Sequence, residues 1–167
     1  MELPEVILES DIDIPDVSRI SHGETISLLA TAFNVYLLPR RLPPIMVDVD
    51  VILPVSQKTV IPDLFVTNHR FSRTEKSGSF EGVPDLIIEV VSPQSFISDT
   101  VTKFDLYASE GVREYWVIVP ETESITVYQL KDGKYEVLAN ALRSGTVHSA
   151  VLPDFVLDLK TVFLDYT

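Results

Sequence analysis

Two segments with helical spacing, set among several short apolar strands, predict an α+β domain with a mixed, mainly antiparallel sheet. Residues 21–38 and 99–110 repeat apolar side chains at intervals of three and four, as helices do. The segments between and after them either alternate apolar with polar residues or run apolar for four to eight residues, which is typical of strands. One helix is therefore N-terminal and the other is inserted between strands. At 167 residues, we expect one domain over 1–167.

The first helix is predicted from Ser21 to Leu38, because Ile26, Leu29 and Phe33 share one face and the prolines of "PRRLPP" end it. Residues 45–53 alternate valine with aspartate, which indicates a strand with one face in water. Residues 59–66 predict a second strand, in which Pro62 indicates an edge or a bulge. The polar loop that follows, residues 67–82, is longer than most connections.

The second half begins with an apolar strand at residues 83–91. Ser98 or Asp99 is a plausible N-cap for the inserted helix, which should end at Glu110 with Gly111 just beyond it. Asp132-Gly133 predicts a tight hairpin between two strands. The remaining expected elements are strands at 114–119 and 124–130, and another strand with a short helical end within 146–163.

Composition excludes several classes of protein. The chain has no cysteine, hence no disulfide, no thiol nucleophile and no Cys-ligated zinc. Its three histidines, His22, His69 and His148, show no ligand spacing. No apolar run approaches the ~20 residues that span a bilayer, and the N-terminus is acidic where a signal peptide is basic. We expect a cytoplasmic protein with no membrane partner.

The formal net charge of −12 argues against a generic coat for nucleic acid, because such a protein repels a polyanion. Contact with DNA or RNA would need a local basic surface. The candidates for that surface follow the first helix or lie in the long loop: Arg40, Arg41, His69, Arg70, Arg73 and Lys76.

The stretch "VPDLIIEVVSP", residues 83–93, places two carboxylates in an otherwise apolar strand. A buried, ionised carboxylate is costly unless it is paired or binds metal. Asp85 and Glu89 are four residues apart, so at ~3.3 Å per residue they lie roughly 13 Å apart along the strand and cannot share one ion. A second ligand must come from a neighbouring strand, and Asp63 in "VIPDLFV" is the candidate.

The inserted helix supplies a cation for this site. Its apolar face is expected to contain Val101, Phe104 and Ala108, with Lys103 on the flank beside Tyr107. From there the Lys103 ammonium could extend back over the sheet toward Glu89. An aspartate, a glutamate and a lysine around a divalent ion can hydrolyse phosphodiesters, because the ion activates water and the lysine orients it.

The strings "IPDLFV", "VPDLIIEVVSP" and "DTVTKFDLYASEGVREYWVIVP" resemble the Uma-two endonucleases, a branch of the PD-(D/E)XK superfamily. The resemblance is strongest over residues 61–120 and extends over most of the chain. It implies a restriction-endonuclease-like core and a nuclease that uses Mg²⁺ or Mn²⁺. The implied substrate is nucleic acid, with DNA favoured over RNA. The resemblance also suggests a homodimer, as does the apolar, strand-rich C-terminal half.

By this resemblance Asp63 and Glu89 are the metal ligands. The superfamily's usual lysine lies two residues after the glutamate, where this chain has Val91, so Lys103 takes that role from the following helix. Glu24 matches the superfamily's acidic residue on the first helix, although Ser21 and Glu24 also fit a capping box.

Several alternatives stay open at this stage. Asp85 is either an accessory residue near the site or a hydrogen-bonding residue at the strand entry, and Tyr107 is expected to pack. We predict that Asp63 and Glu89 lie on adjacent strands, and that the Lys103 ammonium lies within about 4 Å of one of their carboxylates. The competing function is a catalytically inactive nuclease-fold module that acts in self-association or partner binding.

Overall fold

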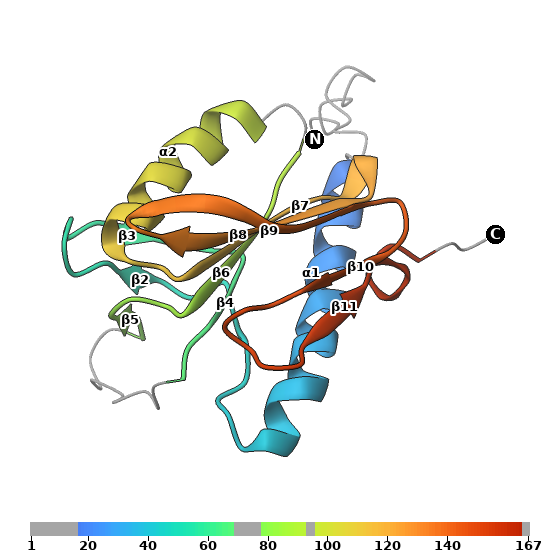
Figure 1. Cartoon of the computed structure of the whole chain (residues 1–167), viewed down its shortest axis with the longest axis horizontal. Coiled ribbons are helices and arrows are strands. Elements are labelled where there is room, and N and C mark those ends of the chain that lie inside the picture. The colour runs from blue at the N-terminus through green and yellow to red at the C-terminus, as the bar shows by residue number, and fades with distance from the viewer. Residues whose placement is uncertain (1–16, 69–77, 93–95, 165–167) are drawn as a thin grey trace, which may run out of the picture.

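A computed structural model describes residues 17–68, 78–92 and 96–164, of which 17–20 and 96–99 are described by backbone only. Within these residues the chain forms two α-helices, as predicted (Figure 1). They are α1 (Val17–Leu37) and α2 (Phe96–Glu110). Three short 3-10 helices accompany them: η1 (Leu38–Arg40), η2 (Pro120–Thr122) and η3 (Leu159–Thr161). Neither α-helix is long and apolar enough to cross a bilayer in the part of the chain that is described.

The main sheet has six strands in the order β1-β4-β6-β7-β8-β9. The strands are β1 (Met46–Val47), β4 (Leu64–Val66), β6 (Leu86–Val90), β7 (Glu114–Val119), β8 (Ser124–Lys131) and β9 (Lys134–Leu142). Only β6 and β7, which α2 connects, pair in parallel within this sheet, so the predicted mixed, mainly antiparallel sheet is confirmed.

Two smaller sheets flank the main one. The first has the order β3-β2-β5, made of β2 (Val51–Ile52), β3 (Thr59–Val60) and β5 (Phe80–Glu81). The second pairs β10 (Thr146–His148) with β11 (Val156–Asp158). The predicted strand and short helical end of the C-terminal segment are therefore present, with one additional strand.

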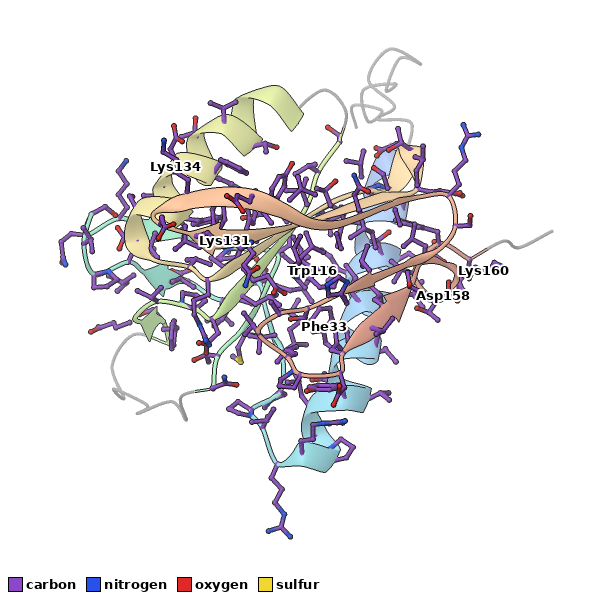
Figure 2. The ribbon with its side chains drawn as sticks, in the orientation of Figure 1. Phe33, Trp116, Lys131, Lys134, Asp158 and Lys160 are labelled. Carbon is purple, nitrogen blue, oxygen red and sulfur yellow. The ribbon has the colours of Figure 1, made fainter. Side chains whose placement is uncertain are left out.

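The two helices cover opposite faces of the main sheet (Figure 1). Because side chains alternate along a strand, Leu86 and Ile88 of β6 join the core beneath α1, whereas Ile87 joins the core beneath α2. Phe33 of α1 meets Trp116 of β7 edge to face, with ring centroids 5.4 Å apart (Figure 2). The same alternation directs Glu89 toward α2.

Both helices begin earlier than predicted. α1 starts at Val17, so Ser21 and Glu24 lie inside the helix and the expected capping box is wrong. Val17 and Ile20 extend the apolar content of the segment by one more turn, which lets the helix start before Ser21. α2 starts at Phe96, so Ser98 and Asp99 are not its N-cap. The predicted end of α2 is confirmed.

Each of the two strands predicted before the long loop is broken. Residues 45–53 give β1 and β2 in different sheets, because Asp48 between them adopts a positive φ of 53°, outside the extended region of a regular strand. Residues 59–66 give β3 and β4, interrupted around Pro62, which has no N–H to donate to a ladder. Asp63 therefore lies directly before β4 rather than inside a strand.

The Asp132-Gly133 turn is confirmed as the hairpin between β8 and β9. Both residues have positive φ, 49° and 76°, as a type I′ turn requires. Lys131 and Lys134 flank this turn at one end of the sheet (Figure 2).

Candidate active site

Asp63 and Glu89 come together at one end of β4 and β6. The register pairs Leu64 with Ile88, which places Asp63 across from Glu89 one position further along. The Val90 N–H donates a hydrogen bond of 2.7 Å to Asp63 Oδ2 and fixes this carboxylate at the end of β6. The two residues are neighbours across adjacent strands, as predicted, although Asp63 lies directly before β4 rather than inside it.

Glu89 is 3% exposed and has two side-chain donors, both from α2. The Lys103 ammonium lies 3.0 Å from Glu89 Oε2, which confirms the predicted contact between them. The Tyr107 hydroxyl donates a hydrogen bond of 2.7 Å to Glu89 Oε1. Lys103 and Tyr107 are four residues apart and therefore adjacent on one face of the helix. Tyr107 was expected to pack only, and its contact with Glu89 was missed.

The buried face of α2 differs from the predicted one. Val101 is 61% exposed, whereas Thr100 and Tyr107 are buried and Phe104 is half-buried. The helix is thus rotated so that Lys103 faces the end of the sheet where Glu89 lies, with part of its stem covered. A lysine can occupy such a position because its long aliphatic stem packs while the ammonium reaches a partner.

His22 of α1 contacts the other carboxylate, with Nε2 3.4 Å from Asp63 Oδ1. Sequence reasoning missed this residue because it judged histidines by their spacing from one another. Helical periodicity could have indicated it: His22 lies seven residues before the buried Leu29, so the two residues share one face of α1. Glu24, the predicted accessory residue, lies about 200° further around the helix. Of the α1 side chains that are described, His22 is the one that forms an ion pair with Asp63.

Asp85 lies at the opposite end of β6, where two groups contact its carboxylate. It pairs with the Arg113 guanidinium, and its Oδ2 accepts a 2.7 Å hydrogen bond from the Asn68 N–H. These contacts join the entry of β6 to the entry of β7. Of the two roles considered for Asp85, the structure supports the hydrogen-bonding role at the strand entry.

A family model described as a putative restriction endonuclease, Uma2, matches residues 9–160. The chain belongs to the Uma2 family. This is the family that the strand and helix motifs resemble, so that prediction is confirmed. No curated protein sequence is significantly similar to the chain.

Solved structures share the fold of this Uma2 protein. One of them is the crystal structure of a putative nuclease belonging to DUF820 from Anabaena variabilis, with 20% sequence identity and a TM-score of 0.68. The match covers 86% of this chain and 80% of that chain. At this level of identity the likeness supports the fold, with its N-terminal helix, inserted helix and mainly antiparallel sheet.

Burial and neighbouring charges shift the pKa values of three groups in the Uma2 site. Burial raises the pKa of the Glu89 carboxyl, and the charge of Asp63 raises it further, while Lys103 and the Tyr107 hydroxyl partly offset this. The hydrogen bond to Asp63 raises the pKa of His22, and burial of the imidazole opposes that shift. Burial beside Glu89 raises the pKa of Tyr107, so its hydroxyl remains a donor at neutral pH.

The donor set fits a hard divalent cation that keeps part of its water shell. Among the described residues, no group of three or more histidine, aspartate or glutamate side chains is arranged to hold a metal. Mg²⁺ is commonly bound by one or two carboxylates together with water and substrate phosphates. Asp63 and Glu89 supply that number of carboxylates, so the residues present fit Mg²⁺ or Mn²⁺.

Of the candidates for a basic surface, Arg40 is described and lies away from this site. Arg40 belongs to η1, which follows the C-terminal end of α1, and so lies about 27 Å from His22 at 1.5 Å per residue. Its guanidinium stacks on the Tyr36 ring and donates to the Tyr36 carbonyl, so it closes the helix end. Four of the other predicted basic residues, His69, Arg70, Arg73 and Lys76, lie outside the described residues.

Proposed function

We propose that this Uma2 protein is a nuclease that hydrolyses phosphodiester bonds with the help of Mg²⁺ or Mn²⁺. The observation that supports this is the convergence of Asp63, Glu89 and Lys103 from three separate elements at one end of the sheet. Two of these groups are carboxylates suited to a hard cation, and the third is an ammonium that reaches the same place.

Each residue has a distinct role in this proposal. Asp63 and Glu89 would hold the cation, which when bound supplies positive charge to the phosphate and lowers the pKa of water. Lys103, a third exposed, orients the attacking water or stabilises charge on the phosphoryl oxygens. Tyr107 keeps Glu89 in one orientation through its 2.7 Å hydrogen bond.

DNA is the proposed substrate, by analogy with restriction endonucleases. The net charge of −12 opposes binding to any polyanion, so binding should depend on the bound cation and on contacts near the site. A protein with few phosphate contacts loses little affinity as salt rises. We therefore expect weak binding with a shallow salt dependence.

Cleavage assays test the proposal. Single- and double-stranded DNA and RNA are incubated with the protein in Mg²⁺, Mn²⁺ or EDTA. We expect cleavage of DNA that requires the metal and falls at least about 100-fold in Glu89→Gln. Glu136→Gln is the matched control, because Glu136 is an exposed carboxylate paired with Lys131 on the hairpin. Intact substrates under all conditions would contradict the proposal.

Self-association is the second candidate function, and the outer face of α1 favours it. A shallow groove there is lined by uncharged residues, and Val35 is 70% exposed. On a chain of net charge −12, an uncharged patch is where a second copy meets least repulsion. The groove is lined by Ala30, Thr31, Asn34, Val35, Leu38 and Pro39.

The mass in solution tests this homodimer. Light scattering at micromolar concentration should show a dimer that Val35→Glu converts to a monomer. Val137→Glu is the control, because Val137 is also exposed but lies on β9. A monomeric wild-type protein would exclude the homodimer.

A further inference from the structure

Each of the four carboxylate oxygens of the site contacts a donor from the described residues of this chain. Asp63 Oδ2 accepts from the Val90 N–H and Oδ1 contacts His22. Glu89 Oε1 accepts from the Tyr107 hydroxyl and Oε2 contacts Lys103. Each oxygen keeps a second lone pair, but a divalent cation that binds here must share the space and the negative charge beside the carboxylates with these donors.

The four donors fall into two classes. Two are fixed: the Val90 N–H belongs to the backbone of a central strand, and Tyr107 is fully buried, with its ring 5.3 Å from that of Tyr115. Two are exchangeable: the side chains of Lys103 and His22 are 33% and 41% exposed. Each carboxylate has one donor of each class.

We propose that Lys103 and His22 hold the place of the divalent cation in the metal-free protein and are displaced when the cation binds Glu89 and Asp63. This inference rests on the proposed metal-dependent function. The contacts of these two side chains, to Glu89 Oε2 and Asp63 Oδ1, are those that can break without unfolding a strand or opening the core. Tyr107 and the Val90 N–H then keep the carboxylates oriented throughout.

Like charge makes the displacement necessary for Lys103. A divalent ion that coordinates Glu89 Oε2 lies about 2.1 Å from that oxygen, and the ammonium now lies 3.0 Å from the same oxygen. Two cations at such separations repel strongly in a partly buried site. The lysine stem is long enough for the ammonium to withdraw by a few ångströms and remain beside the ion, where water or a phosphate oxygen would take Glu89's place as its partner.

The reactivity of Lys103 in the wild-type protein tests displacement directly. A pulse of reductive methylation, followed by peptide mass spectrometry, is carried out with and without saturating Mn²⁺ and without nucleic acid. We expect Mn²⁺ to raise the modification rate of Lys103 about tenfold, because the ammonium loses its carboxylate partner. Lys131, paired with the exposed Glu136, is the internal control and should not change. An unchanged or lower rate at Lys103 would overturn the proposal.

Mn²⁺ affinities of variants provide the second test, by calorimetry at pH 8 on proteins whose thermal melts show that they are folded. Lys103→Met and His22→Leu should each bind Mn²⁺ about tenfold more tightly than the wild type, since each removes a competing donor. Tyr107→Phe, which removes the fixed donor, should not bind more tightly. Weaker binding in His22→Leu would identify His22 as a ligand and overturn its part of the proposal. These readouts need no cleavage, so an inactive protein that behaves as expected would contradict the nuclease function while supporting the displacement.

Discussion

The Lys103 ammonium lies 3.0 Å from Glu89 Oε2, although the two residues belong to different elements and the position two residues after Glu89 is the buried Val91. A strand lysine at that position would share the Glu89 face of the sheet. Here the helix that follows the strand brings the ammonium to the same carboxylate. The valine alone is therefore no evidence for an inactive site, because the positive charge is restored through space.

Replacing Lys103 should abolish cleavage. Lys103→Ala is expected to lower the cleavage rate about 100-fold or more, because it removes the group that orients water or stabilises developing charge. Lys103→Arg should retain little of the cleavage activity, since a planar guanidinium differs from a compact ammonium in geometry and hydration. Lys131→Ala on the exposed hairpin is the matched control and should retain full activity. Full activity in Lys103→Ala would remove Lys103 from the mechanism.

Glu89→Gln should stabilise the protein at neutral pH. Burial raises the pKa of Glu89 in the folded state, so the folded protein favours the neutral carboxyl and ionisation costs stability. The glutamine variant avoids this cost, and its melting temperature at pH 7 should exceed that of the wild type by a few degrees.

The difference in melting temperature between Glu89→Gln and the wild type should depend on pH. Stability associated with a raised pKa is complete below the unfolded value, about 4.3 for glutamate, and is lost as pH rises through the folded value. The two melting temperatures should therefore converge below about pH 4 and separate as pH rises. A variant less stable than the wild type at pH 7 would show that the Lys103 ion pair outweighs the burial of the charge.

The parts of this structure that depend on local rules could be predicted from the sequence. Alternation along residues 83–91 indicated that Glu89 faces away from Ile88, and the Asp132-Gly133 dipeptide indicated a hairpin. The convergence of Asp63, Glu89 and Lys103 followed from strand pairing and lysine reach, together with the family motifs. The geometry agrees with each of these expectations.

The parts that were missed depend on tertiary packing. His22 reaches Asp63 because α1 packs on one face of the sheet with its N-terminal part beside the residue that precedes β4, and no spacing within the sequence encodes that packing. Tyr107 gains its partner through the rotation of α2, which leaves Val101 exposed. The break at Asp48 needs a positive φ in a residue other than glycine, which sequence patterns do not reveal.

The pKa of His22 should lie above the ordinary histidine value of about 6.5, because the Asp63 carboxylate accepts its hydrogen bond. Chemical shifts of the imidazole followed by NMR against pH measure it directly. Asp63→Asn removes the charge and should lower the His22 pKa relative to the wild type. Equal values in the two proteins would mean that the 3.4 Å contact does not persist in solution.

Glu114 is a second buried carboxylate, and its surroundings predict a structural role. It is fully buried on β7. The Trp116 Nε1–H and the Ser149 hydroxyl each donate a 2.7 Å hydrogen bond to Oε1. The N–H groups of Ala150 and Val151 donate to Oε2 at 2.7 and 3.2 Å. Glu114 thus joins the main sheet to the turn between β10 and β11, which covers the core beneath α1.

Glu114→Gln should destabilise the protein by about 2–4 kcal/mol, because the amide NH₂ would replace an oxygen that accepts from donors and leave those donors unsatisfied. Denaturant unfolding measures this free energy, and Glu136→Gln, on an exposed ion pair, should change it by less than about 0.5 kcal/mol.

The change at Glu114 is opposite in sign to that expected for Glu89→Gln. Glu114 accepts only hydrogen bonds that its own fold supplies, whereas Glu89 lies at the sheet end beside a second carboxylate and two displaceable donors. An equal and small effect of both glutamine substitutions would remove the distinction between a carboxylate held for stability and one held for a cation.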